Sequence, residues 1–394
     1  MRYSSLLKNV NLSALLLLIA SVTTAFAEEV TTSENKQATK VAAATVDDFE
    51  ELPAGYHRMP DGTVMANSPS TAVAPPGYHL MPDGTLMPNG ADMEHSGHRK
   101  HGGMWMSDYQ SQHMYMGGML DTTTEVSGED IFAPGSIYSG RYQMTPTDMS
   151  MEMHMVMLMY HSSRYMAMLM MHYMKNEMGM MTSTGEKSTM TTSGAGDTLA
   201  TIEFPLKTLH AKYSLGVSIP TGSITESGPM VGMVGDVRYP YGMQLGSGTY
   251  DVLLGAGIER RVHKMSYAAN YQYVARTGEN SEGYRLGNKY AVDGLLRYHF
   301  SSTWNGDMNL KFSEVDQIHG KDKELMCNEI TCMSPAADYL NTGGRRADFR
   351  LGVKYENSQM TSFAFDYTQP VYQNLTGPQM RTDWIASFRF GYMF

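Results

Sequence analysis

Apolar and polar residues alternate with a period of two from Met104 to the end of the chain. The alternation runs in segments of about 9–14 residues, the length that a tilted strand needs to cross a lipid bilayer. Each segment predicts one strand, and there are twelve of them: 104–116, 149–160, 164–177, 197–206, 209–220, 248–260, 263–276, 288–300, 303–315, 346–356, 359–371 and 381–394.

The connections between these segments alternate between long and short. The long ones are 117–148, 178–196, 221–247, 277–287, 316–345 and 372–380, and the short ones are 161–163, 207–208, 261–262, 301–302 and 357–358. Long outer loops and short periplasmic turns are typical of bacterial outer-membrane barrels, whereas a β-sandwich needs no such alternation. The pattern predicts an all-β fold, a transmembrane antiparallel β-barrel of about 12 strands, with both ends on the periplasmic side.

The two faces of each predicted strand differ in the same way. In segment 381–394 one face is aromatic and apolar (Trp384, Ala386, Phe388, Phe390, Tyr392, Phe394), and the other carries Arg381, Asp383, Ser387 and Arg389. Segments 263–276 and 346–356 divide likewise. A charged residue on a lipid face costs about 2–4 kcal/mol at the bilayer centre, so we expect the polar faces to point into the barrel.

Residues 1–27 have the pattern of a secretory signal peptide. Arg2 and Lys8 give a positive start, an apolar run covers 12–20, and Ala25-Phe26-Ala27 is a small-x-small cleavage site. The apolar run is short for a membrane-spanning helix, and no later segment has the roughly 18 apolar residues that such a helix needs. We expect a mature chain that begins near Glu28.

The net charge is mildly acidic. It is −10 over the whole chain, and without Arg2 and Lys8 it becomes 28 basic against 40 acidic residues, or −12. Because binding to phosphates requires a basic surface, nucleic acid is not an expected partner.

Residues 28–103 are rich in small, polar and charged residues, which predicts a disordered His/Met-rich tail. The tail contains a 22-residue repeat, since residues 53–65 (PAGYHRMPDGTVM) recur as 75–87 (PPGYHLMPDGTLM). Two copies are too few for a solenoid. Each Pro-Asp-Gly is a turn signal, so each copy is expected to form a short turn that carries one His and two Met.

The terminal Phe394 ends a strand in the manner of the C-terminal signal that the barrel-assembly machinery recognises. Residues 144–155 (MTPTDMSMEMHM), 219–224 (IPTGSI) and 241–251 (YGMQLGSGTYD) extend this likeness. With them, residues 104–394 resemble a family of bacterial outer-membrane transporter barrels named for the meta-pathway of phenol degradation. The resemblance implies a barrel that transports small molecules, in the outer membrane of a Gram-negative bacterium. It implies no functional residues and does not include the tail.

Methionine is the unusual residue of this chain, with 26 of 37 copies between Met59 and Met190. In segment 149–160 the register that puts Val156, Leu158 and Tyr160 in lipid points every odd-numbered methionine inward. Segments 104–116 and 164–177 behave alike, so three neighbouring strands predict a thioether-lined wall of the lumen. The same register places Glu152 and His154 outside.

Soft thioethers select Cu(I) and Ag(I), and rows of weak sites suit conduction. One hypothesis is therefore a channel for soft metal ions, of which copper is the expected one. In this hypothesis the tail captures the ion and the barrel passes or holds it. The candidate metal ligands are His57, Met59, Met65, His79, Met81, Met87, His95, His98, His101, Met151, Met153, Met155, Met166, Met168, Met170 and His172.

Other uses of the methionines remain open. Met fills irregular space, and a Met-lined wall suits small organic solutes as well. A structural or oxidant-scavenging barrel is a third interpretation, because Met sulfoxide forms reversibly. The charged lumen-facing residues on the other strands predict either a bracing ion-pair network or a selectivity lining.

Two further expectations concern chemistry. Cys327 and Cys332 lie five residues apart in an oxidising compartment, which predicts a local disulfide in an outer loop. There is no Gly-x-Ser-x-Gly and no His-Glu-x-x-His, so an enzyme is not expected.

Overall fold

The computed structural model describes residues 103–328, 330–357 and 360–394, together with four short strands nearer the N-terminus. The chain divides into two compact units, Met1–Gly97 and His98–Phe394. The expected signal peptide, residues 1–27, lies outside the described residues.

Each 22-residue repeat contributes two short antiparallel strands on either side of its Pro-Asp-Gly. In the first repeat β1 (Tyr56–Arg58) pairs with β2 (Val64–Ala66). In the second, β3 (Tyr78–Leu80) pairs with β4 (Leu86–Pro88). The two registers are identical, because His57 lies opposite Met65 and His79 lies opposite Met87. The sequence repeat is therefore also a repeat of backbone pairing.

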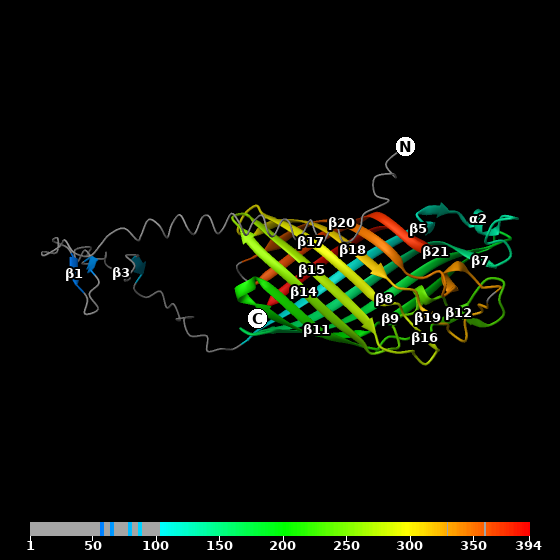
Figure 1. Cartoon of the computed structure of the whole chain (residues 1–394), viewed down its shortest axis with the longest axis horizontal. Coiled ribbons are helices and arrows are strands. Elements are labelled where there is room, and N and C mark those ends of the chain that lie inside the picture. Colours follow the sequence, from blue (N-terminus) through cyan, green and yellow to red (C-terminus); the bar gives the residue numbers. More distant parts are fainter. Residues whose placement is uncertain are drawn as a thin grey trace, which may run out of the picture. The chain divides into compact units, whose positions relative to one another are not determined.

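The second unit is a closed antiparallel barrel, whose tilted strands follow the sequence around the wall in Figure 1. Eleven elements form the closed ring, with β8 pairing to β10 to complete it, and β6 and β9 lie outside it. The barrel elements are β5 (Met104–Thr122), β7 (Met144–His161), β8 (Met166–Thr182), β10 (Thr198–Leu206), β11 (Ala211–Ile219), β14 (Asp251–Val262), β15 (Met265–Arg276), β17 (Lys289–His299), β18 (Trp304–Val315), β20 (Gly344–Glu356) and β21 (Thr361–Met393).

The long element β21 crosses the barrel wall twice. Its first half pairs with β20 and its second half with β5, both antiparallel. An all-antiparallel ring closes only with an even number of crossings, so β21 must turn back, and Gly377 has the positive φ of 71° that a tight turn uses. The Met393 N–H accordingly donates to the Met360 carbonyl at 3.0 Å. The wall is thus crossed twelve times, and the predicted fold class is confirmed.

Several predicted loops are wrong in part. The expected loops 117–148 and 178–196 contain the outer ends of β5, β7 and β8, together with β6 (Thr124–Val126), α2 (Gly128–Phe132) and β9 (Lys187–Ala195). Gly and Pro usually interrupt a strand, but these strands accommodate both Gly118 and Pro146. Gly118 has a positive φ, and Pro146 lies at a register shift before Asp148. The strands continue past the predicted segments because their outer ends pair with neighbouring strands and pack against the long loops.

The outward surface has the pattern of a membrane protein. Side chains of Val156, Leu169, Leu254 and Leu351 point outward and are exposed. Near the short connections, aromatic rings pair across strands, as in Trp105–Tyr160 and Trp304–Tyr355, both with centroids 5.0 Å apart. A second belt of rings near the outer ends includes Tyr273–Tyr290, at 4.8 Å. Two aromatic girdles with an apolar band between them are typical of a lipid-embedded barrel.

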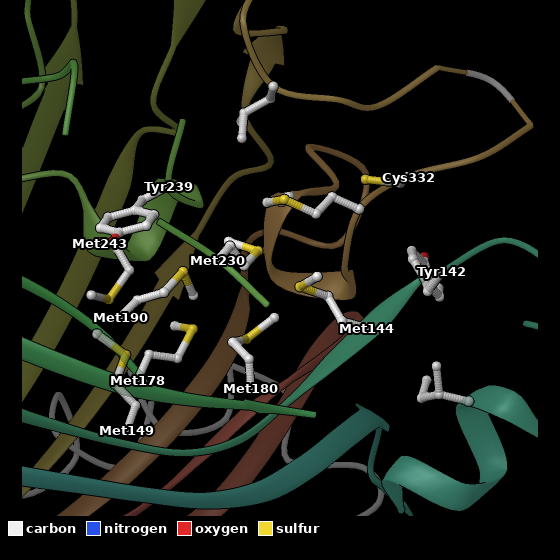
Figure 2. Close-up of a cluster of buried hydrophobic side chains, with 14 of the residues drawn as sticks. Tyr142, Met144, Met149, Met178, Met180, Met190, Met230, Tyr239, Met243 and Cys332 are labelled. Carbon is white, nitrogen blue, oxygen red and sulfur yellow. The ribbon is translucent and has the colours of Figure 1, made fainter. Parts of the chain in front are cut away.

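The long connections fold over the outer ends of β5, β7 and β8. They contain β12 (Ser227–Pro229), β13 (Asp236–Arg238), η3 (Tyr241–Met243), β16 (Tyr284–Arg285), β19 (His319–Gly320) and η4 (Pro335–Ala337), and the short connection after β10 forms η2 (Lys207–Leu209). Met144, Met149, Met178, Met180 and Met190 from the strands meet Met230 and Met243 from the loops, as Figure 2 shows. The principal buried apolar cluster of the described chain is therefore a methionine-rich seal between wall and loops.

Candidate functional site: a cavity inside the barrel

Burial alternates along the methionine-rich strands. On β7, Met149, Met155 and Met159 are buried, whereas Val156 and Leu158 are exposed. On β8, Met174 and Met178 are buried and Met171 and Tyr173 are exposed. Cross-strand pairs such as Met114–Met151 and Met149–Met178 bring thioethers of three strands together.

The polar residues that the sequence places outside lie outside. Glu152 and His154 are both exposed on β7. The Tyr109 hydroxyl and the His154 Nδ1 are 2.8 Å apart, and His113 Nδ1 is 3.6 Å from a Glu152 carboxylate oxygen. Tyr109 lies opposite Val156 in the register, and His113 and Glu152 lie nearer the outer ends of the strands.

A cavity of about 480 Å³ lies inside the outer half of the barrel. Strand residues from β5, β7, β8, β17, β18, β20 and β21 form its wall. Tyr241 and Gly242 of η3, Ala336 of η4 and Asn341 bring the loops against it. Its volume falls in the range of about 300–1,000 Å³ that small-molecule sites occupy.

One side of the cavity is formed by thioethers. Met116, Met149, Met151 and Met178 come from the three methionine-rich strands, and Met380 from β21. Met149 and Met178 are almost completely buried, at 3% and 2% exposure. This side is apolar and polarisable.

The opposite side is basic. Lys289, Lys311, Arg345 and Arg346 line the cavity, and no Asp or Glu does. The Arg346 Nε donates to the Asp348 carboxylate at 2.9 Å and its Nη1 to Thr382 at 3.0 Å. The Arg345 Nη2 lies 2.9 Å from Glu314. Lys289 and Lys311 form no ion pair with a carboxylate among the described residues.

Several charged side chains elsewhere in the barrel form ion pairs. Arg297 makes two hydrogen bonds to Asp307, at 2.7 and 2.8 Å, and Arg276 binds the fully buried Asp251. Arg350 lies 3.9 Å from Asp366. These ion pairs agree with the interpretation of the charged residues as a bracing network. Lys289 and Lys311, which form no ion pair among the described residues, agree with the interpretation as a selectivity lining.

The loop side of the cavity is held by specific polar contacts. The Tyr241 hydroxyl accepts a hydrogen bond from the Asp322 N–H at 3.0 Å, and burial raises the pKa of Tyr241 to about 12. The Thr192 hydroxyl donates to the Met243 carbonyl at 2.8 Å. Arg141 binds Asp338, whose carboxylate also accepts from the Tyr142 hydroxyl at 3.1 Å. Cys327 and Cys332 form a disulfide in the same loop.

The predicted metal ligands divide into three groups. Met151 lines the cavity, and Met153, Met155, Met166, Met168, Met170 and His172 are buried or half-buried on β7 and β8. His57, Met65, His79 and Met87 lie on the paired strands of the repeats. Met59, Met81, His95, His98 and His101 lie outside the described residues. Among the described residues no group of three or more His, Cys, Asp or Glu side chains is arranged to hold a metal ion.

Among the predicted ligands that the structure describes, only His172 has an unsatisfied buried polar atom. It lies opposite Met155 in the register, and its Nδ1 is buried without a hydrogen-bond partner among the described residues. An added Cβ at Gly196 would lie 2.0 Å from the His172 Nε2, so only glycine allows the ring to lie there.

The basic side of the cavity was only partly anticipated. Lys311 was expected to face inward, but Lys289, Arg345 and Arg346 were not singled out. Lys289 shares its face of β17 with Asp293, and Arg346 shares its face of β20 with Asp348, so the same alternation contained the signal for both.

No protein-family model and no curated protein sequence matches the chain. Among solved structures, an outer membrane channel from Pseudomonas putida F1 is similar, with a TM-score of 0.50 and 12% identity over 74% of this chain and 96% of that one. A Pseudomonas aeruginosa FadL homologue (TM-score 0.36, 9% identity, 74% and 89% of the two chains) and the translocator domain of NalP from Neisseria meningitidis (0.39, 11%, 74% and 88%) are less similar.

The similarity to the Pseudomonas putida channel shows a shared fold, and the two lower scores carry no argument. Together with the two aromatic girdles, it gives this chain the fold and the lipid-facing surface of an outer-membrane β-barrel. No described helix is long and apolar enough to cross a membrane. The resemblance to the phenol-degradation barrels stays a prediction.

Proposed function

We propose that this protein is an outer-membrane channel or transporter for small solutes, with a methionine-lined lumen. The observation that carries the proposal is the cavity, which the barrel wall and the folded loops line together. A barrel whose interior were filled by side chains alone would leave no such space. Ligand sites in β-barrels commonly lie at the mouth, where this cavity lies.

The loops determine how such a channel opens. Met243 is fully buried and Met230 and Met333 nearly so, because they pack into the seal over the strand ends. A solute entering from that end must therefore displace packed thioethers. We expect a channel that is closed most of the time and opens when the loops lift.

Single-channel recording of the refolded protein in a planar bilayer tests this proposal. Met243→Asp buries a charge in the seal, so the open probability should rise severalfold over the native protein. Val234→Asp, on the same loop at an exposed position, should leave it unchanged. If neither the native protein nor Met243→Asp conducts, while both fold, the channel proposal is wrong.

A second candidate function is the binding of soft metal ions by the repeats. The specific observation is the register, in which each repeat sets one His directly opposite one Met. In each copy a further Met lies two residues after the His in the sequence. Such a His/Met set would suit Cu(I) or Ag(I), with one site in each repeat.

Titration of the full chain with Cu(I) in competition with a chelator tests this candidate. The native chain should bind two ions with similar affinity. His57→Ala combined with Met65→Leu should leave one, whereas Val64→Leu should leave two. Replacing Met151, Met153, Met155, Met166, Met168 and Met170 with Leu asks whether the wall is also a site. Unchanged metal content after the repeat substitutions would exclude the repeats.

A further inference from the structure

We propose that the cavity binds an amphipathic organic anion, a small molecule with one carboxylate group and an apolar body. The inference rests on the proposed function and names the class of solute. Its basis is that the two sides of one cavity differ in chemistry, with thioethers on one and cationic groups on the other. The carboxylate would lie on the basic side and the apolar body against the methionines.

The charge count favours an anion. The cavity lining contains four cationic side chains and no carboxylate. The carboxylates of Glu314 and Asp348 neutralise Arg345 and Arg346, so four cations less two carboxylates leave two positive charges. The remaining charges are those of Lys289 and Lys311.

The carboxylate of Asp293 is already engaged. Asp293 lies opposite Lys311 in the register of β17 and β18, but its Oδ2 accepts hydrogen bonds from Asn270 and Asn309, at 3.0 and 3.1 Å. No ion pair joins it to Lys311. Because an ammonium group is stabilised by a charge-assisted hydrogen bond to an anion, the two lysines would favour an anionic ligand.

The same charge argues against a soft cation in this cavity. Thioethers attract Cu(I), but here the thioether side faces two uncompensated lysines. Coulomb repulsion in a partly desolvated site opposes entry of a positive ion. Leu375 and Val315 also line the cavity, and their hydrocarbon groups do not bind metals. An apolar body in contact with methionine side chains fits both the composition and the adaptability of this side.

The binding test compares three probes with the same chain: octanoate, octanol and octylammonium. Calorimetric titration into the full-length protein in lipid nanodiscs should show octanoate binding at least about tenfold more tightly than either of the others, the factor expected for one charge-assisted hydrogen bond. Equal binding of octanoate and octanol, or preference for octylammonium, would overturn the proposal.

Two sets of variants locate the site. The double variant Lys289→Gln/Lys311→Gln should lose the preference for octanoate, and Lys289→Arg/Lys311→Arg should retain it. Lys354→Gln removes a lysine elsewhere on the barrel wall, where it pairs with Glu356 at 2.7 Å, and should change nothing. If the double Gln variant folds and still prefers octanoate, the basic side is not the anion site. The Arg variant keeps this test valid should the Gln variant fail to fold.

Conductance of the same preparations separates this inference from the proposed function. A native protein that conducts but shows no preference for octanoate would reject the anion site and leave the channel. Octanoate binding without any conduction in the native protein or in Met243→Asp would reject the channel and leave a binding barrel.

Discussion

At the scale of single residues, the charged groups inside the barrel have two different roles. Arg297 and Asp307 form a bidentate pair that fixes both side chains, and Asp251 is fully buried against Arg276. Such pairs join neighbouring strands and have no charge left for a ligand. Within the part of the chain that the structure describes, Lys289 and Lys311 have no carboxylate in an ion pair, so their charge is available to the cavity.

Asp307→Asn is expected to destabilise the barrel. Arg297 would keep its charge in a site where its side chain is only 23% exposed, while losing its two charge-assisted hydrogen bonds. The free energy of unfolding should fall by about 2–3 kcal/mol, less than the full penalty of a buried pair because the site is partly hydrated.

Urea unfolding of the refolded protein in lipid vesicles measures this change. Glu314→Gln breaks the exposed Arg345–Glu314 pair and should cost less than about 1 kcal/mol. Equal losses for the two variants would mean that the Arg297–Asp307 pair contributes no more than a surface pair.

At the scale of elements, the period-two pattern assigns the faces of every strand. β7 carries methionines on one face and Val156 and Leu158 on the other, and burial follows that division. A slip of one residue would exchange the faces completely, so one substitution on each face tests the register.

Val156→Arg is expected to reduce the free energy of unfolding in lipid vesicles by about 2–4 kcal/mol, because position 156 is exposed near the middle of the apolar band. Met157→Arg is the matched control on the adjacent position. It points inward and lies opposite Asp108 in the register, so it should cost much less. If Met157→Arg is the more damaging variant, the methionines face lipid.

The strands were predictable from the sequence because alternation is a local property. Every one of the twelve predicted segments overlaps an observed strand, and the C-terminal strand ends within one residue of its predicted end. The outer ends of β5, β7 and β8 and the whole of β6 and β9 were missed. Their stability comes from contacts with distant loops, as in the packing of Met190 near Met243, and no local pattern records such contacts.

The candidate site was predictable to a similar degree. Alternation alone places Met149, Met151 and Lys311 inside the barrel. The cavity itself depends on Tyr241, Ala336 and Asn341, which reach it from two long loops. Loop conformation is set by tertiary packing, so neither the contribution of the loops to the cavity nor its division into two sides could be derived from the sequence.

At the scale of the whole barrel, the two ends differ in construction. One end carries short connections and the chain end, where Trp105 and Phe394 exchange backbone hydrogen bonds of 3.1 and 2.8 Å. The other end carries the loops, the methionine-rich seal and the cavity. In outer-membrane barrels the short turns face the periplasm and the long loops face outward. This orientation would place the cavity next to the cell exterior.

Cysteine labelling of intact cells tests the orientation. Val234 on a long loop and Leu209 in a short connection are both well exposed, at 102% and 69%. Because the only two native cysteines form a disulfide, each substitution to Cys provides a single free thiol. A membrane-impermeant maleimide should label Val234→Cys in intact cells and Leu209→Cys only after lysis. The reverse result would place the cavity at the periplasmic end, and the basic side would then meet solutes leaving the cell rather than entering it.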